Sequence, residues 1–135
     1  MKILIAIGIV AVVITGIFLT RKDVSLIHVT VPKPNTVVTS PLVIRGEARG
    51  NWYFEASFPI ELVDGNGVEL ARGIAQAQGD PATGEVNWMT TEFVPFQATL
   101  NFTNPQTTTG IIILKKDNPS GLPEHDAEIR VPVHF

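Results

Sequence analysis

The stretch FVPFQATLNF, residues 93–102, decides the fold class because its side chains alternate in character. From residue 96 onward, apolar side chains occupy the even positions and polar side chains occupy the odd positions. Successive side chains of a β-strand point to opposite faces of its sheet, so the pattern predicts a strand with one buried face and one solvated face.

Turn residues separate six further stretches that have strand-like patterns. The longest is WYFEASFPIELV, residues 52–63, in which every even position from 52 to 62 is apolar. Pro59 lies on its polar side and cannot donate a ladder hydrogen bond, which predicts an edge position or a bulge. The seven predicted strands are residues 27–31, 42–49, 52–63, 68–78, 94–103, 110–116 and 128–135.

These strands predict an all-β fold, specifically an immunoglobulin-like antiparallel β-sandwich of about seven strands. The stretches DGNG (residues 64–67) and NPSG (residues 118–121) have the residues of tight turns. The chain contains no cysteine, so apolar packing must take the place of an inter-sheet disulfide. The aromatic residues expected in this core are Trp52, Phe54, Phe58, Phe96 and Phe102.

The segment ILIAIGIVAVVITGIFL, residues 3–19, contains no charged residue. A membrane-spanning helix needs about 20 apolar residues, with a lower limit near 17. Three interpretations are open: an uncleaved membrane anchor, a cleaved signal peptide and a buried core helix. The sequence GIFLTRKD favours the anchor, because it lacks the small residues of a signal-peptide cleavage site. We therefore expect one N-terminal transmembrane helix that acts as a signal-anchor.

This anchor divides the chain into a membrane segment, residues 1–22, and a β-sandwich domain, residues 23–135. One basic residue precedes the apolar segment and two follow it, a small difference that would favour a cytoplasmic domain. A large C-terminal domain behind a very short N-terminal tail is normally exported whatever these charges are. We therefore expect a single-pass protein whose domain lies outside the cytoplasmic membrane.

Composition excludes several classes of function. The chain has a net charge of −3 and no cluster of lysine or arginine, which argues against a nucleic-acid partner. The sequence has no nucleophile elbow, no phosphate-binding glycine loop and no complete calcium loop. We therefore expect no catalytic residue, no cofactor and no metal site, and the chain is not predicted to be an enzyme.

Two groups of residues are candidates for binding a partner, because exposed aromatic and charged residues on loops are typical of recognition surfaces. The first group is Tyr53 and Glu55, on the polar side of the strand predicted at residues 52–63. The second group comprises Trp88, Lys116, Asp117 and Asn118. Two alternatives compete with binding: Trp88 could be buried under its own loop, and Asp117 and Asn118 could make only local turn hydrogen bonds.

Several motifs, in order, resemble the second GerMN-associated domain family, over about residues 26–135. They are SPLVIRGEARG (40–50), WYFEASFPIELVDGNG (52–67), WMT (88–90), FVPFQATLNF (93–102), KDNPSG (116–121) and IRVPVHF (129–135). The resemblance implies an immunoglobulin-like, non-catalytic, membrane-attached domain of the bacterial cell envelope. We accordingly expect the partner to be an envelope protein or a wall polymer. The alternative is a structural subunit that pairs through an edge strand.

Overall fold

A computed structural model describes residues 26–135 of the chain. The predicted transmembrane helix (residues 3–19), the anchor segment (residues 1–22) and the domain boundary at residue 23 lie outside the described residues. Within residues 26–135, no helix has the length and apolar character needed to span a membrane.

The described residues form seven β-strands and two single-turn 3₁₀ helices. Apart from residues 52–63, each predicted strand lies where the sequence pattern placed it, so the all-β prediction is confirmed. The elements in chain order are β1 (Ile27–Val31), β2 (Leu42–Arg49), η1 (Gly50–Trp52), β3 (Ser57–Asp64), β4 (Glu69–Ala77), β5 (Phe93–Leu100), β6 (Thr109–Lys115), η2 (Pro123–His125) and β7 (Glu128–His134).

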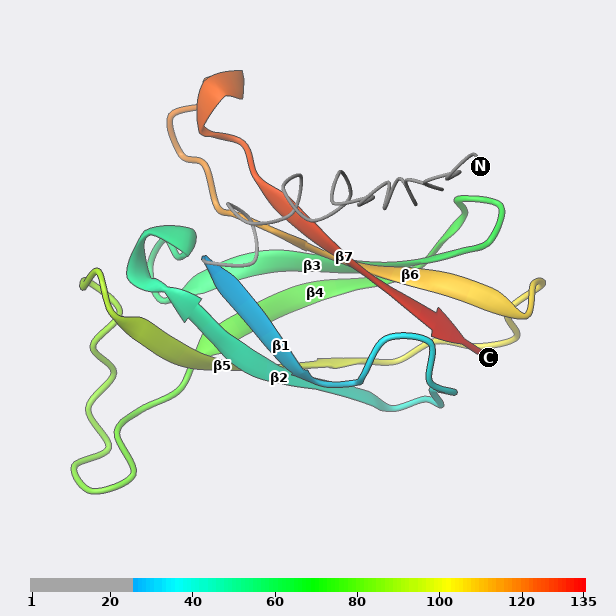
Figure 1. The fold of residues 1–135 in the computed structure, drawn as a ribbon, viewed down its shortest axis with the longest axis horizontal. Coiled ribbons are helices and arrows are strands. Elements are labelled where there is room, and N and C mark those ends of the chain that lie inside the picture. Colours follow the sequence, from blue (N-terminus) through cyan, green and yellow to red (C-terminus); the bar gives the residue numbers. More distant parts are fainter. Residues whose placement is uncertain (1–25) are drawn as a thin grey trace, which may run out of the picture.

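The strands form one continuous sheet in the order β1-β2-β5-β4-β3-β6-β7, and every neighbouring pair is antiparallel. We expected two separate sheets. They are joined because β4 pairs with β3 along most of its length, and its last residues, Gln76 and Ala77, also pair with β5. The sheet therefore curls almost into a barrel, with β1, β2 and β5 on one side and β3, β6 and β7 on the other (Figure 1).

Residues 35–38 bring the two ends of this sheet together. The Asn35 N–H donates to the Pro132 carbonyl at 2.7 Å, and the Val38 N–H donates to the His134 carbonyl at 2.8 Å. The bridge between Val37 and His134 is parallel. The chain thus pairs first with β2 through β1 and then crosses to β7, where it covers the C-terminal half of that strand.

Residues 50–57 depart from the predicted long strand. Glu55 and Ala56 have φ angles of 50° and 63°, and the backbones of Phe54 and Ser57 exchange hydrogen bonds of 2.9 and 3.1 Å. Two central residues with positive φ, enclosed by such a pair, make a tight hairpin turn of the kind that matches the twist of strands. β3 consequently begins only at Ser57.

This turn corrects two predictions of burial. Because it interrupts the alternation, Trp52 and Tyr53 are both buried, whereas 42% of Phe54 is exposed. Phe54 is therefore not a core residue, and Tyr53 is not on the surface.

Pro59 was predicted at an edge or at a bulge. It is at neither, because β3 lies between β4 and β6 and its register with β4 shifts only between Leu62 and Val63. Pro59 is opposite Ile74 of β4, one position before the pairing of β3 with β6 begins at Ile60. The proline therefore lies just outside the β3–β6 pairing, so that ladder loses no donor. Pro132, by contrast, lies on β7, the last strand of the sheet order.

The core is built on aromatic edge-to-face contacts rather than on a disulfide. The Phe58 ring lies 5.0 Å from Phe96, 5.3 Å from Tyr53 and 6.3 Å from Trp52, at steep interplanar angles. Aromatic pairs in this arrangement add about 0.5–1.5 kcal/mol to the burial of their area. Phe102 is only partly buried and packs against Phe135, with ring centroids 5.5 Å apart.

Candidate recognition surface

Three connections gather at one end of the molecule: residues 50–56 between β2 and β3, residues 78–92 between β4 and β5, and residues 116–127 between β6 and β7. The antiparallel pairing places them together, since the end of each preceding strand lies beside the start of the next strand in the sheet. Figure 1 shows them at the end opposite the C-terminus. We call these residues the three-loop end.

The short helix η1 holds the other two loops in place. The Asp117 N–H donates to the Trp52 carbonyl at 3.0 Å, and the Gly50 N–H donates to the Glu92 carbonyl at 3.1 Å. A Cβ atom at Gly50 would clash with the backbone carbonyl oxygens of Trp88 and Thr90, so this position requires glycine. The three loops are therefore connected through their backbones.

Arg49, the last residue of β2, fixes the start of β5 beside this helix. Its guanidinium lies 3.9 Å from the centroid of the Phe93 ring, and its Nη1 donates to the Thr91 carbonyl at 3.3 Å. The Glu92 carboxylate is 3.9 Å from the same Nη1. The His28 ring stacks on Phe93 with centroids 4.9 Å apart. The loop 78–92 is thus tied to β1 and β2 by side chains as well as by backbone.

Asp80 orders the tip of the loop 78–92. Its carboxylate accepts hydrogen bonds from the backbone N–H groups of Ala82 (2.6 Å) and Thr83 (3.2 Å). Its own N–H donates to the Glu85 carbonyl at 2.8 Å, and Gly84 takes the positive φ of 74° that closes the turn. The exposed side chains of this loop are therefore presented on a defined backbone.

Asn118 likewise orders the loop 116–127 through hydrogen bonds. Its amide nitrogen donates to the Leu122 carbonyl at 2.8 Å and to the Asp126 carboxylate at 2.7 Å. The Gly121 N–H donates to the Asn118 carbonyl at 3.1 Å, which confirms the turn predicted at NPSG. Asn118 makes the local hydrogen bonds that the sequence offered as the alternative to binding.

The other candidate residues lie at different depths. The Tyr53 hydroxyl is buried and donates to the Val94 carbonyl at 2.6 Å, and burial raises the pKa of this phenol far above its ordinary value. Glu55 is exposed at the tip of its turn, and Lys116 and Asp117 are half-buried. Trp88 is partly buried against the edge of the core. All six candidates therefore belong to the three-loop end, and Tyr53 is the one that is buried.

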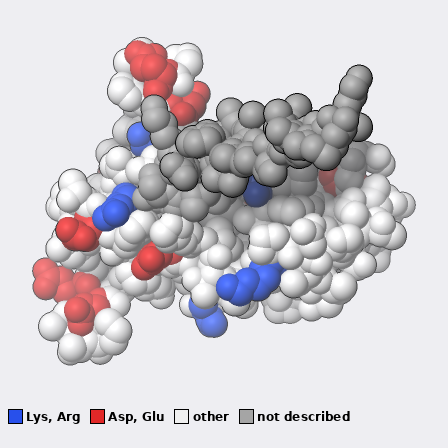
Figure 2. Space-filling model, viewed as in Figure 1, with Lys and Arg blue, Asp and Glu red and all other residues white. Residues whose placement is uncertain are grey.

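The three-loop end is strongly acidic. Its loops contain seven carboxylates and one basic residue, so their net charge is 1 − 7 = −6. The opposite connections, residues 32–41, 65–68 and 101–108, contain one basic residue and no acidic residue, a net charge of +1. Acidic side chains are visible over the three-loop end in Figure 2. The seven carboxylates are Glu55, Asp80, Glu85, Glu92, Asp117, Glu124 and Asp126.

Exposed apolar side chains accompany these charges, one or more on each loop. They are Phe54 (42% exposed), Met89 (78%) and Leu122 (47%), with Val86 on the same loop as Met89. A hollow of about 310 Å³ lies between the loop 78–92 and the start of β5, lined in part by Glu85, Glu92 and Phe93. Sequence reasoning missed Phe54 because the alternation placed it in the core. Within residues 26–135, no group of three metal-binding side chains is assembled.

Residues 26–121 match the family described as the immunoglobulin-like domain of bacterial spore germination, Gmad2. The chain belongs to this family. No curated protein and no solved structure gives a significant match. The resemblance noted in the sequence is thereby confirmed, and Gmad2 membership supports an immunoglobulin-like binding module in general terms.

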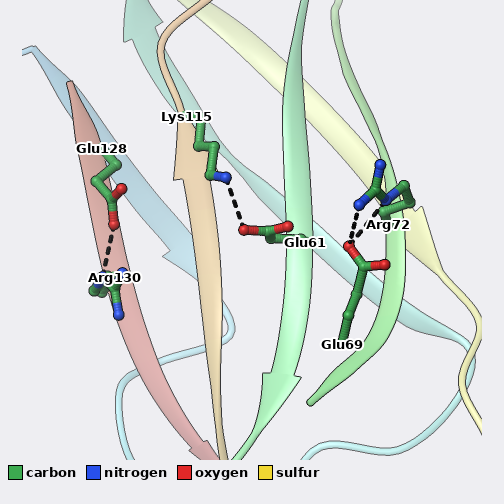
Figure 3. Close-up of polar contacts among 6 residues, drawn as sticks. All are labelled: Glu61, Glu69, Arg72, Lys115, Glu128 and Arg130. Atoms are coloured by element: carbon green, nitrogen blue, oxygen red, sulfur yellow. Dashed lines mark hydrogen bonds and ion pairs between the residues drawn. The ribbon is translucent and has the colours of Figure 1, made fainter. Parts of the chain in front are cut away.

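In this Gmad2 domain, most carboxylates on the strands form ion pairs, whereas most carboxylates on the three loops do not. On the outer side of the sheet, Lys115 lies 2.9 Å from Glu61, Arg72 lies 2.8 Å from Glu69, and Arg130 lies 2.6 Å from Glu128 (Figure 3). The hydrogen bond from Lys115 lowers the pKa of Glu61. Within residues 26–135, Glu92 is the one carboxylate of the three loops that pairs with a basic side chain. The strand carboxylates are thus mostly compensated, whereas those of the three-loop end present a net negative field.

Proposed function

We propose that the chain is a membrane-anchored, non-catalytic immunoglobulin-like module of the bacterial cell envelope, and that it binds an envelope protein or a wall polymer through the three-loop end. The observation that carries this proposal is the concentration of uncompensated carboxylates and exposed apolar side chains on three loops whose backbones are joined through η1. Apolar side chains at the centre of an interface supply affinity, and charges select the partner.

The three loops are conformationally ordered, and this supports a role in recognition rather than as a flexible linker. Gly50, Asp80 and Asn118 each fix a part of the three-loop end through hydrogen bonds. A surface that is ordered before it binds loses less conformational entropy on association, and this preserves affinity. The exposed residues Phe54, Met89 and Leu122 would then contact the partner without prior rearrangement.

The proposal assigns residues 3–19 to the membrane and the domain to its outer side. The absence of charge in this segment and its length support the assignment. Protease treatment of intact cells tests it, because an outer domain is digested and a cytoplasmic domain is protected. Recovery of the full chain in the membrane fraction after alkaline washing tests the anchor itself.

Site-specific photocrosslinking tests the recognition surface. A photoreactive phenylalanine analogue replaces Asn87 in the three-loop end or Asn66 in the turn at the other end, and both side chains are exposed. The full chain is then irradiated in the native envelope. We expect adducts from position 87 and none from position 66. Adducts from position 66 alone, or from neither position, would contradict the proposal.

A second candidate function, assembly through an edge strand, is supported by the outer edges of β1 and of the first half of β7. Neither edge pairs with another strand within residues 26–135. The Glu128–Arg130 ion pair lies on that part of β7, and charged side chains on an edge oppose strand addition. A second copy of the chain crosslinked through Glu128, with no adduct from Asn87, would favour assembly.

A further inference from the structure

We infer that the three-loop end faces the membrane surface and that its partner is a basic, membrane-proximal segment of another membrane protein. This inference deepens the proposed function and depends on its membrane anchor at residues 3–19. It chooses between the two classes of partner, envelope protein and wall polymer, that the proposed function leaves open.

The position of the first strand carries the inference. Ile27 at the start of β1 pairs with Ala48 near the end of β2, and the Arg49 N–H donates to the Leu26 carbonyl at 2.7 Å. The polypeptide therefore enters the domain at the three-loop end. Phe135 lies at the other end, where its N–H donates to the Thr108 carbonyl at 2.9 Å.

The length of chain before Leu26 limits how far this end can be from the bilayer. Residues 20–25 separate the apolar segment from Leu26, and six residues span at most about 20 Å even when fully extended. The eight-residue strand β2 adds about 27 Å between the three-loop end and the opposite end. The loops are therefore held close to the lipid headgroups, and the opposite end projects away.

Charge then selects the occupant of this surface. A net charge of −6 on the three loops repels anionic headgroups and phosphate-bearing polymers. The same charge attracts lysine and arginine side chains, over a screening length of about 8 Å at physiological salt. Phe54, Met89 and Leu122 add apolar contact area that a protein segment can cover. A basic protein segment near the bilayer satisfies both the position and the charge.

The orientation is tested by energy transfer on the full chain in phosphatidylcholine vesicles that contain a headgroup-labelled acceptor. The chain has no cysteine, so single cysteines at Asn87 or Asn66 accept a donor dye without a background. We expect markedly higher transfer efficiency from position 87 than from position 66. Equal efficiencies, or a higher efficiency from position 66, would overturn the inferred orientation.

The class of partner is tested with two variants of equal charge. One variant removes a carboxylate from each loop: Glu55→Gln, Glu85→Gln and Glu124→Gln. The control removes three strand carboxylates: Glu47→Gln, Glu61→Gln and Glu69→Gln. The probe is a synthetic peptide of alternating lysine, leucine and arginine, titrated against the full chain in the same vesicles.

We expect the loop variant to bind the probe about tenfold more weakly than the unmodified chain, since each exposed charge pair contributes a small factor. The control should stay within about twofold, and the affinity of the unmodified chain should fall as salt is added. Equal losses in both variants, or no loss in either, would overturn the inference.

The inference and the proposed function can fail separately. Photocrosslinking from Asn87 to a wall polymer would preserve the recognition function and overturn the basic protein partner. If position 87 gave no adduct in the envelope, the proposed function itself would fail, whatever the vesicle measurements showed.

Discussion

Ala56 adopts a backbone conformation that is unfavourable for alanine. Its φ of 63° lies in the left-handed region, where a residue with a Cβ atom is less stable by roughly 1–2 kcal/mol. The preceding Glu55 adopts the same region, although asparagine and glycine are the usual residues of such a turn.

The substitution Ala56→Gly should stabilise the domain by about 1 kcal/mol, because glycine adopts positive φ without steric cost. Equilibrium unfolding in urea measures this change. The control is Ala75→Gly, at a fully buried strand position, which should destabilise the domain because of lost packing and greater backbone entropy. Destabilisation by both substitutions would show that Ala56 is not strained.

Tyr53 makes the free energy of unfolding depend on pH in alkaline solution. Burial raises the pKa of its phenol above the ordinary value of 10.0, so the native chain keeps a proton that the unfolded chain loses. The free energy of unfolding should therefore fall as pH rises past about 10, by roughly 1.4 kcal/mol for each further pH unit.

The substitution Tyr53→Phe should remove this dependence. It should also cost about 1–2 kcal/mol near neutral pH, because the Val94 carbonyl loses its donor from the phenol. The chain has one tyrosine, so its near-ultraviolet absorbance follows the ionisation directly. Ionisation of the native phenol near pH 10, without unfolding, would be inconsistent with its burial.

At the scale of elements, the ion pair between β3 and β6 makes the free energy of unfolding depend on pH in acid. The hydrogen bond from Lys115 lowers the pKa of Glu61 below its ordinary value of 4.5. The stabilisation of the fold by this ion pair is therefore complete above pH 4.5 and is lost as pH falls through the native pKa of Glu61.

The substitution Lys115→Gln should lower the free energy of unfolding at neutral pH by less than about 1 kcal/mol, because the pair is partly exposed. The difference from the unmodified chain should vanish near pH 2, where the carboxylate is protonated in both states. Denaturant titrations across this range measure it, and Lys116→Gln serves as the control. A difference that persisted in acid would indicate lost packing rather than a lost charge pair.

The sequence predicted elements well where the alternation was uninterrupted. β5 buries Val94, Phe96, Ala98 and Leu100 as the pattern required. The pattern failed at residues 52–56, because Glu55 and Ala56 form a tight turn without the residues that normally announce one. Alternation on both sides of the turn then looked like a single strand.

The candidate surface could be predicted only in part. Loop composition indicated Trp88, Lys116, Asp117 and Asn118, and strand alternation indicated Glu55 as an exposed residue. The structure brings all five to the three-loop end. The hydrogen bonds that join these loops through Gly50 and Trp52 depend on antiparallel pairing across the whole sheet, which no local pattern specifies. For the same reason, the join between β4 and β5 was not foreseen.

At the scale of the whole molecule, the closure of the curled sheet depends on the segment 35–38. Val37 and Val38 are neighbours in this segment, but Val37 is 71% exposed and Val38 is 6% exposed. This makes them a matched pair for measuring what the closure contributes.

The substitution Val38→Ala should destabilise the domain by about 1–3 kcal/mol, whereas Val37→Ala should change stability by less than about 0.5 kcal/mol. Thermal unfolding measures both. Hydrogen exchange should also accelerate at the His134 and Val38 amides in the first variant, because these two groups bond across the closure. Equal effects of the two substitutions would mean that the segment contributes little to the closed sheet.

The parallel course of residues 35–38 beside β7 has a mechanical consequence. Leu26 and Phe135 lie at opposite ends of the molecule, so a pull applied between them acts along the strands. The hydrogen bonds of Asn35, Val38 and His134 would then be loaded together in shear, instead of opening one after another like a zip. A domain built in this way resists tension applied along its strands.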